Sequence, residues 1–129
     1  MEDLALLRQA REAMAQSYSP YSGFPVGAAL LCEDGSVYRG CNIEGASYGN
    51  AICAERTALV KAVSEGRRRF SKLAVMANTE DYCTPCGICR QMLYEFAPDL
   101  AVICGRADGD YAVYSLRELL PKAFSAADL

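Results

Sequence analysis

Two short segments of this sequence carry residue types that suit a metal-dependent catalyst. Residues 53–56 read CAER and residues 85–89 read PCGIC. The chain has no histidine, so a zinc site would rest mainly on cysteine thiolates. Cys53, Cys86 and Cys89 are therefore candidate zinc ligands, and three protein ligands leave a fourth position open, as is typical of catalytic zinc. Glu55 lies close enough to a ligand to exchange protons with a water at that position.

Both segments are expected at the start of a helix. A helix N-terminus carries partial positive charge, which stabilises a thiolate. We therefore expect these cysteines to ionise more readily than free cysteine. Cys86 and Cys89 are three residues apart, on one side of a first turn. Arg56 is a candidate for hydrogen bonding to the ligand sulfurs, which would draw charge away from three thiolates.

Two other interpretations of the same cysteines stay open at this point. Residues 86–89 have the C-x-x-C spacing of a thiol–disulfide oxidoreductase, although that activity would leave residues 53–55 without a role. A structural zinc site would need a fourth ligand, and Cys83 is the obvious choice. Pro85 directs that loop away from helical geometry, which argues against it. The remaining cysteines are expected to be small core residues in or beside apolar strands: Cys32, Cys41 and Cys104.

Length, composition and charge exclude several classes of protein. The 129 residues are 52% hydrophobic and 22% charged, which suits a single domain spanning 1–129. The net charge of −3 argues against a nucleic-acid binder, which needs a basic face. The longest apolar stretches, such as 26–32, are too short to span a membrane. The chain has seven cysteines, an odd number, and its first residues are acidic and form no apolar leader. Together these features predict reduced thiols and a cytoplasmic location.

The hydrophobic pattern alternates between strand and helix periods. An Asp34-Gly35 turn signals a hairpin, Gly66 is expected to end a helix, and Pro85 is expected in a first helical turn. Ser115 and Glu118 form a capping box for a last short helix. The pattern predicts helices at 2–17, 53–64 and from about 85 to 96, and strands at 26–32, 37–42, 73–77, 100–104 and 111–114. This alternation indicates an α/β domain with helices on both faces of a central sheet.

Five motifs, in order along nearly the whole chain, resemble the small cytidine deaminase family. They are YSPYSGFPVGAA at 18–29, NIEGASY at 42–48, CAER at 53–56, PCGICRQ at 85–91 and LLPKAF at 119–124. The resemblance implies a three-layer αβα sandwich with a mixed five-stranded sheet and one Zn²⁺ per subunit. It also implies a hydrolase of pyrimidine salvage that converts free cytidine, and 2'-deoxycytidine, to uridine and ammonia. Glu55 would pass a proton from the attacking water to ring atom N3 and then to the departing amino group.

The same resemblance implies a substrate-binding set. Asn42 and Glu44 would hold the ribose hydroxyls, and Phe24 would pack on the base. Phe124 would be donated by a neighbouring subunit, because the family forms homotetramers with shared active sites.

Further along the chain, the resemblance implies that backbone groups near Ala54 and Thr84 read the base edge. Two positions depart from the family pattern. Gly45 stands where the family commonly has a larger residue, often asparagine, and Pro25 adjoins the base-packing aromatic. A different aminopyrimidine nucleoside, such as the antibiotic blasticidin S, is therefore the alternative substrate.

Overall fold

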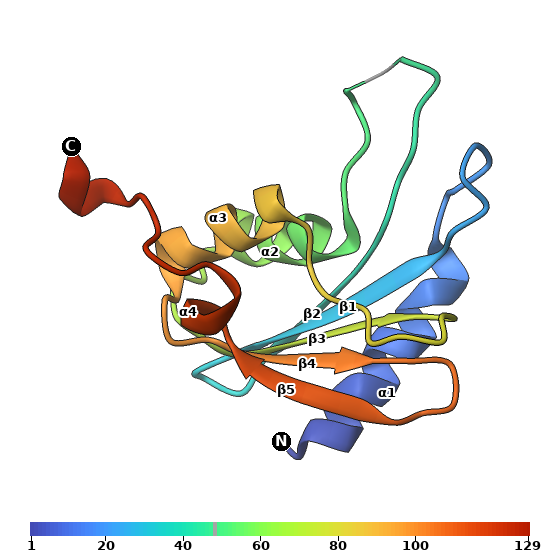
Figure 1. Cartoon of the computed structure of the whole chain (residues 1–129), viewed down its shortest axis with the longest axis horizontal. Helices are drawn as coiled ribbons and strands as arrows, with labels where there is room; N and C mark the ends of the chain where they lie inside the picture. The colour runs from blue at the N-terminus through green and yellow to red at the C-terminus, as the bar shows by residue number, and fades with distance from the viewer. Residues whose placement is uncertain (48) are drawn as a thin grey trace.

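One five-stranded sheet separates the helices of this chain into two layers (Figure 1). This computed structural model describes residues 1–47 and 49–129, so Tyr48, the last residue of the second family motif, lies outside the described residues. The strands are β1 (Val26–Cys32), β2 (Val37–Cys41), β3 (Phe70–Ala77), β4 (Ala101–Gly105) and β5 (Tyr111–Ser115). Their order is β2-β1-β3-β4-β5. β3 and β4 run parallel, and the other neighbouring strands are antiparallel.

Helices cover both faces of the sheet. α1 (Asp3–Ala13) packs on one face, whereas α2 (Ala54–Ser64), α3 (Gly87–Phe96) and the short α4 (Leu116–Leu119) lie on the other. The side chains of β1 alternate between the two cores: Ala28 and Leu30 pack toward α2, and Ala29 and Leu31 toward α1. A strand buried on both faces must be continuously apolar, which explains the run at 26–32. The expected αβα sandwich with a mixed five-stranded sheet is confirmed.

Gly40 lets the start of α2 approach the sheet closely. It pairs with Ala28 across β1 and β2. A Cβ atom at this position would lie 2.4 Å from the carbonyl oxygen of Ala54 and 2.5 Å from the backbone nitrogen of Ala58. Only glycine fits so near another backbone. This contact fixes the height of the first turn of α2 above the sheet, and that turn carries residues 53–56.

Most predicted elements are confirmed, and three boundaries are wrong. The helix predicted at 2–17 ends as an α-helix at Ala13, and a 3-10 helix follows at Met14–Gln16. Gly66 follows α2 with φ +95°, and the Ser115 capping box is present. β3 begins at Phe70 rather than residue 73, because β1 extends far enough to pair with Phe70 and Lys72. Pro85 lies before α3 rather than in its first turn. Cys86 keeps extended backbone angles (φ −70°, ψ 169°) and is the N-cap, so helical geometry starts only at Gly87.

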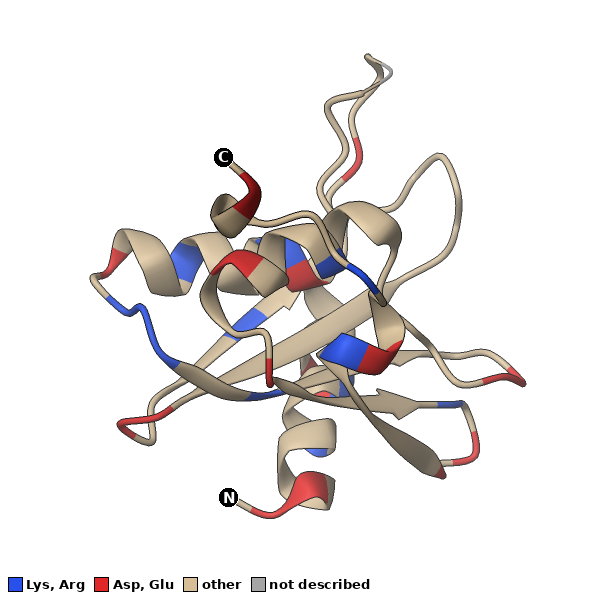
Figure 2. Ribbon diagram, turned by 60° about the vertical axis from the view of Figure 1, so that its left-hand side comes forward, with Lys and Arg blue, Asp and Glu red and all other residues tan. Residues whose placement is uncertain are grey.

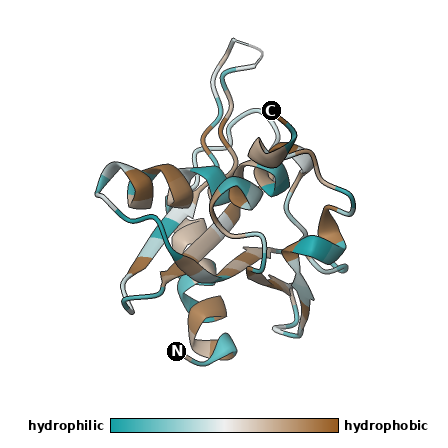
Figure 3. Cartoon of the chain, turned by 90° about the vertical axis from the view of Figure 1, so that its left-hand side faces the viewer, coloured by the Kyte–Doolittle hydropathy of each residue, from teal (hydrophilic) through white to brown (hydrophobic). Residues whose placement is uncertain are grey.

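Three further cysteines lie in strands, and the C-terminal segment follows α4. The prediction of core cysteines is confirmed for Cys32 and Cys104, which are buried, while Cys41 is only partly buried. The C-terminal segment extends from the body and closes in a short 3-10 helix at Ala126–Asp128, which the pattern did not predict. The hydrophobic stretches of the chain lie mainly in the helices and strands (Figure 3). No helix in the described part of the chain has the length and hydrophobicity needed to cross a membrane.

Candidate active site

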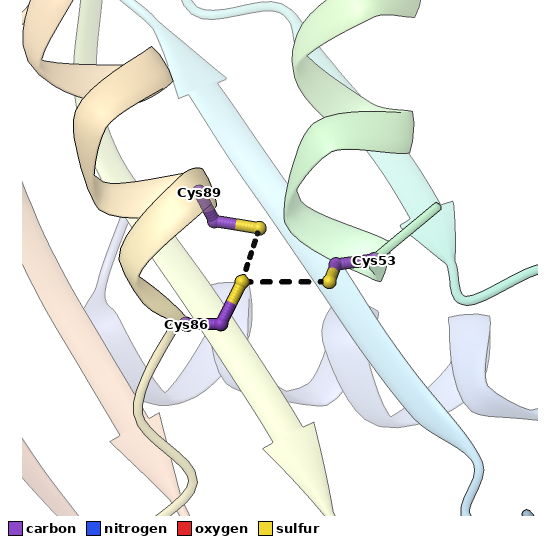
Figure 4. A group of neighbouring side chains, drawn as sticks. All are labelled: Cys53, Cys86 and Cys89. Atoms are coloured by element: carbon purple, nitrogen blue, oxygen red, sulfur yellow. Dashed lines mark hydrogen bonds between the residues drawn. The ribbon is translucent and has the colours of Figure 1, made fainter. Parts of the chain in front are cut away.

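Three cysteine thiols meet where α2 and α3 begin. Cys53 is the N-cap of α2, Cys86 is the N-cap of α3, and Cys89 lies in the first turn of α3. The Sγ atoms of Cys53 and Cys86 are 3.6 Å apart, and those of Cys86 and Cys89 are 3.4 Å apart. Figure 4 shows the three sulfur atoms turned toward one another from the two helices. All seven cysteines of the chain are free thiols.

The sulfur positions fit a zinc ion. Tetrahedral zinc with Zn–S bonds of about 2.3 Å holds its sulfur ligands about 3.8 Å apart, close to the observed separations. The group contains Cys53, Cys86 and Cys89, and among the described residues no fourth cysteine, aspartate or glutamate belongs to it. Cys83 lies outside the group, and burial raises its pKa to about 12, so it stays a neutral thiol. The cluster therefore fits a zinc site with an open position and not a closed four-cysteine site.

The three thiols do not ionise equally without a metal. Burial acts to raise the pKa of Cys86, but hydrogen bonds from the Cys89 backbone N–H and from neighbouring thiols outweigh it, and the pKa is lowered. Burial raises the pKa of Cys53, and it raises that of Cys89 strongly. The expectation that helix starts would make all these thiols more acidic is right for Cys86 and wrong for the other two. A bound dication is what would ionise them.

Within the described part of the chain, Glu55 is the one buried charged residue. Its side chain is 4% exposed, because the first turn of α2 lies against the sheet. Burial raises the pKa of this carboxyl, and the nearby Arg56 and Cys89 only partly oppose the shift. A buried carboxyl with a raised pKa and a pocket in front of it is the usual form of a general acid–base catalyst.

Arg56 lies behind the thiol cluster. Its Nη2 atom is 4.0 Å from Cys53 Sγ and donates to the Ala51 carbonyl oxygen at 3.4 Å. Its Nε atom is buried and has no hydrogen-bond partner among the described residues. A guanidinium in this position places positive charge beside a cluster that becomes negative when its thiols ionise.

A pocket of about 450 Å³ opens in front of these groups. It brings together nearly all the residues singled out from the sequence. The lining residues are Ser22, Phe24, Val26, Asn42, Glu44, Cys53, Ala54, Glu55, Cys83, Thr84 and Cys86. Cys89 is buried behind the lining, and Phe124, with 59% of its surface exposed, lies on the C-terminal segment away from this pocket.

Sequence reasoning missed two lining residues, Val26 and Ser22, and considered a third, Cys83, only as a fourth zinc ligand. Val26 begins an apolar run, which suggested only core packing. Ser22 read as an ordinary turn residue, although it lies inside the family motif at 18–29. Its hydroxyl and backbone contacts become visible only in the structure.

The amide of Asn42 is held by its neighbours in one orientation. Its Oδ1 accepts from the Val26 N–H at 2.9 Å and from the Ser17 hydroxyl at 2.5 Å, and its Nδ2 donates to the Phe24 carbonyl at 2.8 Å. Backbone N–H groups only donate and carbonyls only accept, so the amide cannot be flipped. Among the described residues, one N–H of the amide has no partner and can serve a ligand.

Glu44 is held in the same way by the loop before β1. Its Oε1 accepts from the backbone N–H groups of Tyr21 and Ser22 at 3.1 and 3.0 Å, and its Oε2 accepts from the Ser22 hydroxyl. The Ser22 hydroxyl, followed by these N–H groups, lowers the pKa of Glu44. A carboxylate offers about four acceptor sites, so one remains. Asn42 and Glu44 thus present one donor and one acceptor, which suits a hydroxyl that does both.

The family follows from comparison with known sequences. Residues 1–105 match the family model described as the cytidine and deoxycytidylate deaminase zinc-binding region. The chain belongs to the cytidine deaminase family. The thiol cluster, Glu55 and the pocket all come from the stretch that this family model matches.

Similarity to individual members of the cytidine deaminase family extends over the whole chain. A cytidine deaminase of Halalkalibacterium halodurans is 52% identical over 130 residues, which cover 100% of this chain and 98% of the relative. That of Sporosarcina psychrophila is 50% identical, covering 96% and 92%. The crystal structure of cytidine deaminase from Burkholderia pseudomallei superposes with a TM-score of 0.93 at 46% identity, covering 96% of this chain and 100% of that one.

Zinc content tests the ligand set. We expect the native chain to hold one zinc ion, and Cys53→Ala, Cys86→Ala and Cys89→Ala to lose it, as measured by elemental analysis after gel filtration. Cys83→Ala is the matched control, a thiol of the same pocket, and should retain the metal. Arg56→Gln should retain zinc with roughly 10-fold lower affinity in a chelator competition, as expected for a residue that supports the ligands. Loss of zinc from Cys83→Ala as complete as from the other three would favour a four-ligand structural site.

The buried carboxyl of Glu55 predicts a pH-dependent stability difference in the metal-free protein. A raised pKa in the folded state means that stability is fully present below the unfolded-state pKa, 4.5, and is lost as pH rises through the folded value. At pH 7 with chelator, Glu55→Gln should therefore melt roughly 3–6 °C higher than the native chain, equivalent to about 1 kcal/mol. At pH 4 the two melting temperatures should coincide. A native chain as stable as the variant at pH 7 would mean that the ionised carboxylate is well compensated. Circular dichroism melts give the comparison.

Proposed function

We infer that this chain catalyses the zinc-dependent hydrolytic deamination of cytidine to uridine and ammonia. The observation that carries the inference is the convergence of three thiols and the buried Glu55 on a single pocket in a chain of the cytidine deaminase family. The pocket volume of about 450 Å³ falls in the range of small-molecule sites. The pocket has groups for both parts of a nucleoside: the thiols and Glu55 for the base, and the Asn42–Glu44 pair for the sugar.

The chemistry divides between the metal and one carboxyl. Zinc held by Cys53, Cys86 and Cys89 supplies a Lewis acid, which lowers the pKa of water from about 15.7 toward about 7. Glu55 takes a proton from the attacking water and delivers it to N3 of the ring, as the water oxygen forms a bond to C4. Glu55 then carries the second proton of that oxygen to the amino group, and the C4–N bond breaks to release ammonia. Burial suits this role, because a carboxyl whose pKa is raised holds its proton for part of the cycle.

Arg56 offsets the charge of the three thiolates. Thiolates donate charge to zinc and weaken it as a Lewis acid, and a guanidinium 4.0 Å from Cys53 Sγ draws some of that charge back. Its unpartnered, buried Nε is a second donor on the same side of the cluster.

The substrate is bound through both its sugar and its base. The free N–H of Asn42 and the free acceptor site of Glu44 take a ribose hydroxyl, and the ring of Phe24 packs on the base. Backbone groups at Ala54 and Thr84, both in the pocket lining, read the edge of the ring. 2'-Deoxycytidine is a second substrate of the same site.

Gly45 determines the shape of the loop that follows the sugar-binding pair. A Cβ at this position would lie 2.5 Å from the side-chain oxygen of Asn50, so a larger residue would displace Asn50. Gly45 lines a neighbouring hollow of about 410 Å³ with Glu44 and Ser22 rather than the pocket itself. The departure from the family pattern therefore lies beside the sugar and leaves the groups that act on the base unchanged.

The partner is a free nucleoside and not a polynucleotide. None of the described residues that line the pocket is lysine or arginine, and acidic and basic positions are interspersed along the ribbon (Figure 2). Binding of a nucleic-acid backbone requires clustered positive charge. We place this single-domain enzyme in the cytoplasm, where it would serve pyrimidine salvage.

The exposed apolar groups support a homotetramer. Ile88 and Met92 are exposed along α3, where they line a shallow hollow of about 650 Å³. Beside it, Gln91 Nε2 donates to the carbonyl oxygen of Phe124 at 2.8 Å, and the Phe124 ring points to solvent. Contiguous exposed apolar residues mark association surfaces, and a ring held out in this way can enter a neighbour's site.

Subunit mixing tests the shared site. We expect sedimentation equilibrium to give four times the chain mass of 14.0 kDa, and Phe124→Ala to raise KM for cytidine roughly 10-fold. Tetramers mixed from Phe124→Ala and Glu55→Ala chains should contain sites with neither defect, so mixing should restore a low-KM fraction of activity. A monomer with native KM in the Phe124→Ala variant would contradict the shared site.

Ammonia release from cytidine by the zinc-loaded protein tests the function itself. We expect turnover from cytidine, and Glu55→Ala should retain zinc while turnover falls roughly 10²- to 10⁴-fold, the usual contribution of general acid–base catalysis. Glu65→Ala, at the opposite end of α2, is the matched control and should behave as native. Blasticidin S is assayed in parallel. Release from the antibiotic alone would keep the mechanism and overturn the cytidine assignment.

A further inference from the structure

Two segments far apart in the sequence are joined along one side of the pocket. The Tyr18 N–H donates to the Asn42 carbonyl at 3.0 Å, and the Glu44 N–H donates to the Tyr18 carbonyl at 2.9 Å. The loop before β1 therefore runs beside the segment that leaves β2 (Figure 1). The first segment carries Phe24 and the second carries Asn42 and Glu44. The relative position of the base-packing ring and the sugar-binding pair depends on how these two segments are held together.

Ser22 lies at the junction of the two segments. Its hydroxyl donates to Glu44 Oε2 and accepts from the Phe24 N–H at 3.1 Å. Its own backbone N–H donates to Glu44 Oε1 at 3.0 Å. A hydroxyl has a single proton to donate. The Phe24 N–H is a donor, so the Ser22 oxygen must act as an acceptor toward it, and this contact does not use the hydroxyl proton. The Ser22 proton is therefore directed at the carboxylate.

We propose that Ser22 is a positioning residue for the substrate, which holds the Glu44 carboxylate in the orientation that receives a sugar hydroxyl. This inference rests on the proposed function, in which Glu44 binds the ribose. Ser22 contacts both oxygens of Glu44 and so restrains the carboxylate from rotating. One acceptor site of the carboxylate is left for a ligand in the pocket that Ser22 and Glu44 both line. The Ser22 hydroxyl is also the main reason why the pKa of Glu44 is lowered, so the carboxylate is an ionised acceptor.

The proposal predicts an effect on binding and not on chemistry. Glu44 meets the sugar, away from the reacting C4–N bond, so loss of its alignment removes binding that is equal in the ground and transition states. Such a loss raises KM and leaves kcat unchanged. Two backbone N–H groups still reach Oε1 in a Ser22→Ala variant, so the loss is partial. One hydrogen bond of ordinary strength corresponds to roughly a 3- to 10-fold change.

The experiment combines two variants with two substrates. KM and kcat are measured for the native protein, Ser22→Ala and Ser22→Thr with cytidine and with 2',3'-dideoxycytidine, which lacks the 2'- and 3'-hydroxyls of the sugar and keeps the 5'-hydroxyl. We expect Ser22→Ala to raise KM for cytidine about 3- to 10-fold with kcat within about twofold of native, and Ser22→Thr, which keeps the hydroxyl, to restore KM. With 2',3'-dideoxycytidine, native and Ser22→Ala should have the same KM, because this substrate offers Glu44 no 2'- or 3'-hydroxyl.

Ser36 provides a matched control for the loss of a serine hydroxyl. Ser36→Ala removes a hydroxyl that donates to the Asp34 carboxylate at 2.6 Å in the turn between β1 and β2, and it should behave as native with both substrates. An unchanged KM for cytidine in Ser22→Ala would overturn the proposal. An equal rise in KM with both substrates would also overturn it, since Ser22 would then act through the Phe24 loop. Absence of cytidine turnover in the native protein would be a failure of the proposed function instead.

Discussion

Everything at this site depends on holding three sulfur atoms within reach of one ion. The sulfurs come from two helices that follow different strands, so no local sequence can bring them together. The sheet does so: β1 lies between β2 and β3, and α2 and α3 start on the same face above it. Gly40 permits the start of α2 to come down onto the sheet. A side chain at that position would lift Cys53 away from Cys86, and the separations of 3.4 and 3.6 Å would be lost.

Burial in this arrangement destabilises the charged forms of the groups at the site. Without a metal, the pocket buries a carboxyl whose pKa is raised and two thiols whose pKa values are raised as well. Each of these groups is in an unfavourable position for the charge that its role requires. A dication reverses this balance, because it favours the thiolates and the carboxylate together. Among the described residues, Arg56 supplies the one fixed positive charge in contact with the cluster. The site is therefore organised for an ion, and the protein alone does not stabilise its charged form.

The pair that we propose to bind the sugar differs from the thiol cluster in this respect. Asn42 and Glu44 lie near the surface, and backbone groups and hydroxyls satisfy nearly all of their hydrogen-bonding capacity before any ligand arrives. What remains is one donor and one acceptor in fixed positions. Such preorganisation reduces the entropy lost when a substrate binds. In the proposed function, the thiols and Glu55 supply reactivity through burial, whereas Asn42 and Glu44 supply recognition through groups that are already held in place.

The sequence by itself indicated the candidate zinc ligands, the candidate catalytic carboxyl, the family and the layered fold. These follow from the absence of histidine, from the spacing and order of the motifs, and from the alternation of strand and helix periods. The Ser115 capping box could also be predicted, because its hydrogen bonds join residues only three positions apart in the sequence. The tertiary structure alone decided what depends on contacts between distant segments: the early start of β3, the place of Cys86 as N-cap, and the burial that opposes ionisation of Cys53 and Cys89. Ser22 belongs with these, because a serine in a turn becomes significant only when folding places a carboxylate from another segment in front of it.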